Sequence, residues 1–123
     1  HRNALYGVLW YTVYEIAFTF KPGTYDEDFE RLDAQIAQSA RATPGFVGVR
    51  MWHSPDGLVR NAVYTWEHLD NLQDFSRSAA HLQGKSEYRR WYDGYEIVVS
   101  EVLSRYGDGR LDPDGGASAG PPR

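Results

Sequence analysis

The order in which hydrophobic spacing changes along this 123-residue sequence is the feature that most constrains its fold. Apolar and aromatic residues alternate over residues 13–20, as in a β-strand with one buried face. Helical spacing follows, from a capping-box pattern of Thr24 and Glu27 to the stretch "ATPG" that ends the helix. Two further alternating stretches, 46–52 and 58–66, are separated by the turn sequence "HSPDG" and are expected to pair as a hairpin.

The second half of the sequence repeats the change from helical to alternating spacing. A second helix is expected with Asp70 as its cap, and its buried face carries Leu72, Phe75 and Ala79. A short helical turn is expected to stop at Gly94, before a last strand over residues 95–106. The order strand, helix, strand, strand, helix, strand is that of ferredoxin-like domains. We therefore predict an α+β fold, a βαββαβ unit whose two helices cover one face of a four-stranded antiparallel sheet.

The sequence is expected to form one domain with two flanking segments. The domain is predicted to span residues 13–106, after an N-terminal extension of residues 1–12 that could add contacts along a dimer. Residues 107–123 contain five glycines and three prolines, so they bury too little apolar surface to order themselves and are expected to form a flexible tail. The opposite face of the sheet carries too many apolar side chains to stay in water, so a second copy or a ligand should cover it.

Charge and residue usage exclude several partners. A net charge of −4 with a pI near 5.5 argues against nucleic acid and anionic membrane surfaces. The apolar stretch at residues 6–20 is interrupted by Thr12, Glu15 and Thr19, which makes it too polar and too short to cross a bilayer. The chain has no cysteine, which excludes thiolate chemistry and fits a reducing cytoplasm. A small molecule or another protein is the expected partner.

Candidate site residues come from the histidines, the aromatic residues and a basic run. His81 follows two alanines at a helix end, where it can ligate iron or act as a base near neutral pH; the alternative is a histidine that bonds the last helix carbonyls. His53 and His68 lie beside turns and are expected to be solvated. Arg89, with its neighbours, could pair with an oxyanion of a ligand or form a solvated face. The aromatic residues expected to line a pocket, or alternatively to pack the core, are Tyr14, Trp52, Tyr64, Trp66, Phe75 and Tyr88.

The stretches "PGFVGVRMW", "VYTWEHLDNLQDF" and "SAAHL", in this order of elements, resemble the antibiotic biosynthesis monooxygenase superfamily over roughly residues 13–106. Members of this superfamily form dimeric α+β barrels. Some are cofactor-independent oxygenases that convert aromatic polyketide phenols to quinones, and others bind or degrade haem. The resemblance therefore implies a homodimer and a monooxygenase that uses molecular oxygen, with either no cofactor or haem.

The resemblance also assigns roles to single residues. The "AAH" stretch is similar to that of haem-degrading members, which implies His81 as the axial ligand of haem iron; their first-strand asparagine and second-helix tryptophan have no counterpart here. Quinone-forming members have the tryptophan of the "WE" pair, here Trp66, and an asparagine four residues before it. Ala62 occupies that position, and Asn61 lies one position before it, on the other face of the strand.

Three functional classes follow from these residues. An oxygenase would hold a planar phenol between aromatic side chains, with His81, Asn61 or a tyrosine helping to remove its proton. A haem protein would use His81 as the axial ligand, with Arg89 or Lys85 near a propionate. A non-catalytic module would shelter a hydrophobic ligand. No metalloprotease, serine hydrolase or phosphate-loop motif is present.

Overall fold

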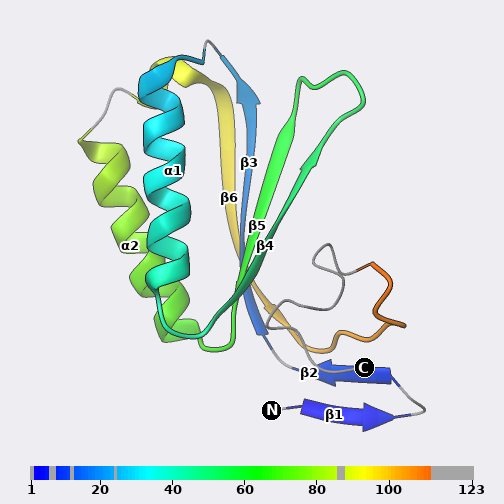
Figure 1. The fold of residues 1–123 in the computed structure, drawn as a ribbon. Helices are drawn as coiled ribbons and strands as arrows, with labels where there is room; N and C mark the ends of the chain where they lie inside the picture. The colour runs from blue at the N-terminus through cyan, green and yellow to red at the C-terminus, as the bar shows by residue number, and fades with distance from the viewer. Residues whose placement is uncertain (1, 6–7, 12, 24, 86–87, 112–123) are drawn as a thin grey trace.

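A computed structural model describes residues 2–5, 8–11, 13–23, 25–85 and 88–111 of the chain. Two short strands come first, followed by the elements of the main domain (Figure 1). In chain order the elements are β1 (Arg2–Leu5), β2 (Val8–Tyr11), β3 (Val13–Pro22), α1 (Glu27–Ala42), β4 (Phe46–His53), β5 (Arg60–Trp66), α2 (Leu69–Gly84), the 3-10 helix η1 (Tyr88–Trp91) and β6 (Tyr92–Val102).

The main sheet has four antiparallel strands in the order β4-β5-β3-β6. Both helices lie on one side of it, whereas β1 and β2 pair only with each other, near the lower end of the sheet in Figure 1. The predicted α+β ferredoxin-like fold is therefore confirmed. The hydrophobic core fills the space between helices and sheet, and its largest fully buried side chains are Trp66, Trp91, Phe75, Ile16, Leu72 and Val13.

Strand pairing fixes which side chains share a face. Ile16 lies opposite Tyr64 on β5 and Val99 on β6, and Ile16 and Tyr64 belong to the core. Side chains alternate along a strand, so Ala17 points to the other side, together with its partners Val63 and Val98. The inner and outer faces predicted for β3 and β5 are confirmed by this register. We call the side without helices the outer face.

Both helices begin at positions that differ from the prediction. The N-cap of α1 is Asp26, whose Oδ1 accepts a hydrogen bond from the Phe29 backbone N–H at 2.9 Å, whereas Thr24, the predicted cap, lies outside the described residues. The prediction that Asp70 caps α2 is wrong. His68 holds that position without a side-chain hydrogen bond, and Asp70 lies in the first turn, where the helix dipole favours its charge.

The last strand begins earlier than predicted because its pairing with β3 outweighs the turn preference of Gly94. η1 ends at Trp91, and β6 starts at Tyr92 opposite Pro22, with a register shift in β3 between Lys21 and Pro22. Gly94 therefore lies inside the strand, which ends at Val102 rather than Tyr106.

Gly23 closes the end of β3 against η1. Its backbone N–H donates a hydrogen bond to the Trp91 carbonyl oxygen at 2.6 Å. A Cβ at this position would lie 3.0 Å from the carbonyl oxygens of Arg90 and Trp91, so a larger residue would fit only if these backbone atoms moved. The contact holds η1 against the end of the sheet.

The flanking segments are described in part. Residues 1–12 include the β1–β2 pair, and residues 107–111 continue from the domain, while residues 112–123 of the predicted tail lie outside the described residues. Within the described ranges, α1 and α2 both fall short of the length and apolar character that a bilayer span requires.

Candidate functional site

Aromatic rings gather at the end of the domain where β3 stops, α1 starts and β6 starts. Tyr25 stacks on Phe29 with ring centroids 3.9 Å apart and planes 9° apart. Tyr92 meets Phe20 edge-on at 5.0 Å and Phe29 at 6.3 Å. Tyr64 of β5, opposite Ile16 of β3, acts electrostatically on Tyr92. We call these five aromatic residues the aromatic cluster.

Two charged side chains, Asp33 of α1 and Arg60 of β5, lie at the edge of the aromatic cluster. The Arg60 guanidinium carbon lies 5.2 Å from the centroid of the Tyr25 ring, a cation–π distance. Asp33 acts electrostatically on Tyr25, Tyr64 and Tyr92. Although the Asp33 residue is exposed to solvent, partial desolvation of the carboxyl raises its pKa, and the Arg60 charge opposes this rise. The cluster thus combines a carboxyl group and a cation with aromatic rings.

The tyrosines of the cluster hold their protons more tightly than free tyrosine does. Burial raises the pKa of Tyr64 to about 12, and the Asp33 charge adds to the effect. Burial also raises the pKa of Tyr92 to about 12, against a lowering by its hydrogen bond with Gln83. The pKa of Tyr25 is raised mainly by burial, and its hydroxyl is buried without a hydrogen-bond partner in the described part of the chain. All three phenols are neutral at pH 7, and Tyr25 can still bind a ligand oxygen.

The structure brings three of the predicted aromatic residues together, two of them packed on Tyr64 of the aromatic cluster. Trp66 lies 4.6 Å from Phe75 and 6.2 Å from Tyr64 between ring centroids, and Tyr64 lies 5.1 Å from Phe75. Trp66 and Phe75 are fully buried, and Tyr14 packs against the same core. The indole N–H of Trp66 is buried and has no partner among the described residues. These residues belong to the packed core, as the alternative reading of the sequence allowed.

Other predicted residues lie apart from the cluster. Trp52 is exposed on the outer face, paired with Asn61, whose side-chain oxygen is buried there without a partner in the described ranges. Arg89 is exposed in η1, and nothing is described for the side chain of Tyr88. His53, predicted to be solvated, is exposed and contacts the Ser54 carbonyl oxygen through Nδ1 at 2.8 Å. The roles predicted for Trp52, Asn61, Arg89 and Tyr88 stay predictions.

His81 lies in the last turn of α2 and is exposed. It shares a side of the helix with Ser78, whose hydroxyl shares a hydrogen bond with Ser39 of α1 at 2.9 Å, whereas Leu72, Phe75 and Ala79 form the buried side. The imidazole is therefore on the flank of α2 that does not face the sheet. A role for His81 as a base or a haem ligand stays a prediction.

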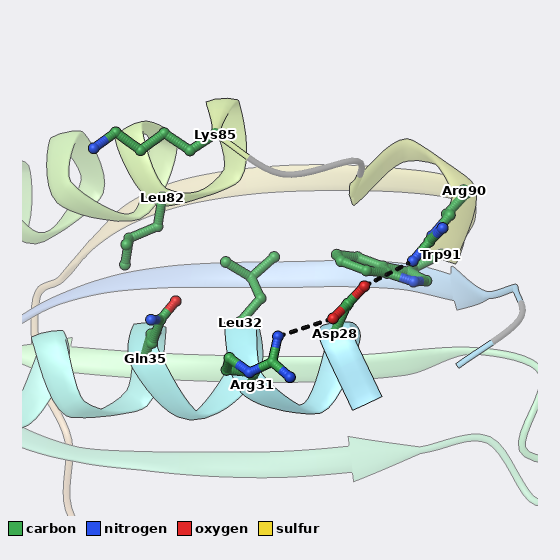
Figure 2. Close-up of a pocket in the computed structure, with 8 residues that line it drawn as sticks. All are labelled: Asp28, Arg31, Leu32, Gln35, Leu82, Lys85, Arg90 and Trp91. Atoms are coloured by element: carbon green, nitrogen blue, oxygen red, sulfur yellow. Dashed lines mark hydrogen bonds and ion pairs between the residues drawn. The ribbon is translucent and has the colours of Figure 1, made fainter. Parts of the chain in front are cut away.

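A recess lies on the helical side of the molecule, lined by residues of α1, the end of α2 and η1 (Figure 2). It has a volume of about 440 Å³. Its walls are Asp28, Arg31, Leu32, Gln35, Leu82, Lys85, Arg90 and Trp91. We call this recess the interhelical groove.

Sequence reasoning missed Asp33, Arg60, Tyr25 and Tyr92 as site residues. Alternation did place Arg60 on the same face as Ala62 and Tyr64, so the direction of its side chain was available from the sequence. Asp33 gave no comparable signal, because it is one of seventeen acidic residues and only the packing of α1 on the sheet brings it near the tyrosines.

Among the described residues, no three histidine or carboxylate side chains come together to hold a metal ion. No family model matches the sequence, and no curated protein matches it. Solved structures do match. A variant of SnoaB, a cofactor-independent oxygenase from Streptomyces nogalater, is 17% identical with a TM-score of 0.60, over 74% of this chain and 93% of that one.

Two further structures show the same likeness. Rv0793 from Mycobacterium tuberculosis is 22% identical with a TM-score of 0.56, over 76% of this chain and 96% of that one. A Nitrosomonas europaea protein that carries the provisional name of antibiotic biosynthesis monooxygenase is 14% identical with a TM-score of 0.58, over 74% of this chain and 90% of that one. The chain therefore has the fold of these structures, as its resemblance to the antibiotic biosynthesis monooxygenase superfamily predicted.

Proposed function

We propose that this protein is a small monooxygenase-type enzyme that oxidises a phenolic or related aromatic molecule with molecular oxygen, at the aromatic cluster. The observation that carries the proposal is the placement of Asp33 and Arg60 beside three neutral tyrosines. The fold shared with a cofactor-independent oxygenase supports it.

The chemistry follows from these groups. A flat phenol lies against the rings of Tyr25 and Phe29, and Asp33, whose raised pKa makes it a stronger base than an ordinary aspartate, accepts the phenol proton. Arg60 pairs with the phenolate that results. For an anthrone-type substrate the electron-rich anion then transfers an electron to oxygen. The resulting radical and superoxide combine to form a C–O bond at the former CH₂ carbon, and protonation gives a hydroperoxide. Loss of the remaining C–H proton and cleavage of the O–O bond then leave one oxygen atom as the carbonyl and release the other as water.

In this proposal Asp33 takes the role of base that the sequence suggested for His81, Asn61 or a tyrosine. Haem remains the alternative, with His81 as its axial ligand, and no described feature of the cluster requires it. Exposed side chains on the outer face, Trp52 and Val98 among them, support a homodimer in which a second copy covers this face. A cytoplasmic location stays part of the proposal, and the lack of cysteine fits it without determining it.

The test is oxygen uptake by protein treated with EDTA, using anthrone as substrate. Wild type should consume oxygen, and Asp33→Asn should lower kcat by about 10²-fold or more, as expected for loss of a general base. Arg60→Gln should also lower it, whereas Asp74→Asn, another exposed helix carboxylate, should leave it unchanged.

Two outcomes contradict the proposal. Loss of oxygen uptake in His81→Ala, together with a Soret band from added haem that this variant abolishes, would favour the haem protein. Tight binding of anthrone without any oxygen uptake would favour the non-catalytic binding module.

A further inference from the structure

The hydroxyl of Tyr25 is a polar group that the fold itself does not use. It is buried, and it has no hydrogen-bond partner among the residues that the structure describes. A buried hydroxyl without a partner destabilises the folded protein, and such groups in native structures are rare enough to need a reason, of which a role in binding is one. Tyr92, in the same cluster, differs because its hydroxyl bonds Gln83.

The ring of Tyr25 is fixed by contacts that do not involve the hydroxyl. Tyr25 lies just before Asp26, the N-cap of α1, and its ring stacks on Phe29 with centroids 3.9 Å apart. The Arg60 guanidinium carbon lies 5.2 Å from the ring centroid. Both contacts are made by the aromatic ring, so a phenylalanine at this position would keep them. The hydroxyl is therefore not needed to hold the ring in place.

The Tyr25 hydroxyl lies near the other polar groups of the aromatic cluster. Asp33 follows Phe29 by one helical turn, so the two residues share a side of α1. Burial is the main cause of the raised pKa of Tyr25, and the Asp33 charge adds to it. The pKa of Tyr92 is likewise raised mainly by burial, with contributions from Asp33 and Tyr25. Such interactions weaken with distance, which puts these polar groups in one region.

The chemistry of this region determines which ligand atom suits the hydroxyl. Tyr25 keeps its proton at pH 7, so it can act as a hydrogen-bond donor. An ionised ligand group beside it would be repelled by the Asp33 carboxylate. A neutral carbonyl oxygen has no such repulsion, and it accepts a hydrogen bond through either of its lone pairs.

We propose that Tyr25 donates a hydrogen bond to a carbonyl oxygen of the bound aromatic molecule, and that the site thereby selects hydroxyaryl ketones over simple phenols. This inference rests on the proposed function, in which Asp33 and Arg60 act on the phenol oxygen. The ligand then has two oxygens in fixed places, one that loses its proton to Asp33 and one that Tyr25 holds. Tyr25 is a specificity residue and takes no part in the proton transfer.

The probe pair 9-fluorenone and fluorene tests the contact, because these flat tricyclic molecules differ in the carbonyl oxygen. Neither is a phenol, so binding is measured apart from oxidation, by the quenching of tryptophan fluorescence. Tyr25→Phe should weaken the binding of 9-fluorenone by about fivefold or more, and that of fluorene by less than about twofold. Two ligands measured on two proteins isolate the pair of hydroxyl and carbonyl.

Tyr95→Phe is the matched control. Tyr95 pairs with Phe20 on the helix side of the sheet and is 56% exposed, and its loss of a hydroxyl should leave both affinities unchanged. Urea unfolding of the proteins without ligand adds a second measurement. The midpoint of Tyr25→Phe should equal or exceed that of wild type, because the variant removes a buried polar group that has no partner.

Three outcomes would overturn the proposal. Tyr25→Phe could weaken the ketone and the hydrocarbon equally, Tyr95→Phe could cause the same loss, or Tyr25→Phe could lower the urea midpoint and leave ketone binding unchanged. Binding of the probes in the interhelical groove would give the last of these affinities. Failure of the proposed function is a separate result: no oxygen uptake from anthrone, together with a selective loss of 9-fluorenone binding in Tyr25→Phe, would contradict the oxidation and support the Tyr25 contact.

Discussion

At the scale of single residues, the direction of a side chain and its burial decide whether it belongs to the aromatic cluster and how its pKa shifts. Strand alternation predicted that Tyr64 points inward, and the structure confirms it. The sequence could not show that Asp33, Arg60 and Tyr92 meet there, because their positions are 27 or more residues apart and depend on how α1 and β6 pack on the sheet. Side-chain direction is thus readable from local spacing, whereas the partners of a side chain depend on the whole fold.

The raised pKa values of Tyr64 and Tyr92 predict how stability depends on pH. Both groups titrate near 10 when unfolded and near 12 when folded. Below pH 10 they leave the free energy of unfolding unchanged; between pH 10 and 12 only the unfolded chain loses these protons, so stability falls, by up to about 1.4 kcal/mol per pH unit for each group. Urea unfolding at several pH values measures the fall.

Absorbance of tyrosinate at 295 nm provides the control for this prediction. In native protein the tyrosinate absorbance of Tyr64 and Tyr92 should appear only as the pH approaches 12, and in concentrated urea it should appear near pH 10. Tyr64→Phe and Tyr92→Phe identify the two signals, because each variant lacks one of them. A Tyr64→Phe protein with an unchanged loss of stability above pH 10 would contradict the assignment.

At the scale of elements, short-range signals and long-range pairing compete. The types and order of the main elements follow from periodicity, but the start of β6 does not, since Gly94 indicates a turn while pairing with β3 carries the strand back to Tyr92. The contact between Gly23 and η1 has no sequence signal either. It depends on two backbone segments that lie 68 residues apart and meet only in the folded sheet.

Two glycines at this end of the sheet should respond differently to alanine. Gly23→Ala should destabilise the protein by more than about 1 kcal/mol, because a Cβ would press on backbone atoms that cannot move alone. Gly94→Ala, with nothing within 4 Å of the added Cβ, should be neutral or stabilising by up to about 1 kcal/mol. Denaturant midpoints compare the two, and similar losses in both would contradict the account.

At the scale of the molecule, the outer face is the surface that one protomer leaves open. Val98 and Val99 are neighbours on β6 and are similarly exposed, at 43% and 51%, but they point to opposite sides of the sheet. Val98 shares the outer face with Ala17 and Val63, and Val99 shares the helix side with Ile16. The pair therefore distinguishes the two faces of the sheet.

The proposed homodimer predicts different outcomes for these two positions. Wild type should sediment as a dimer, and Val98→Glu should shift it toward monomer because a carboxylate is buried at the interface. Val99→Glu, on the side that faces the helices, should remain dimeric. Sedimentation velocity measures both, and a monomeric wild type, or dissociation caused by Val99→Glu instead, would contradict a sheet-to-sheet dimer.

The central position of β3 also affects how the protein folds during synthesis. β3 comes before both of its partners in the chain, and β6 lies about 80 residues after it. A ribosome therefore releases β3 long before the strand that completes its pairing, and long-range pairing of this kind is slow. Until residue 102 emerges, the edge of β3 that pairs with β6 has no partner, and chaperones that hold extended segments can bind there.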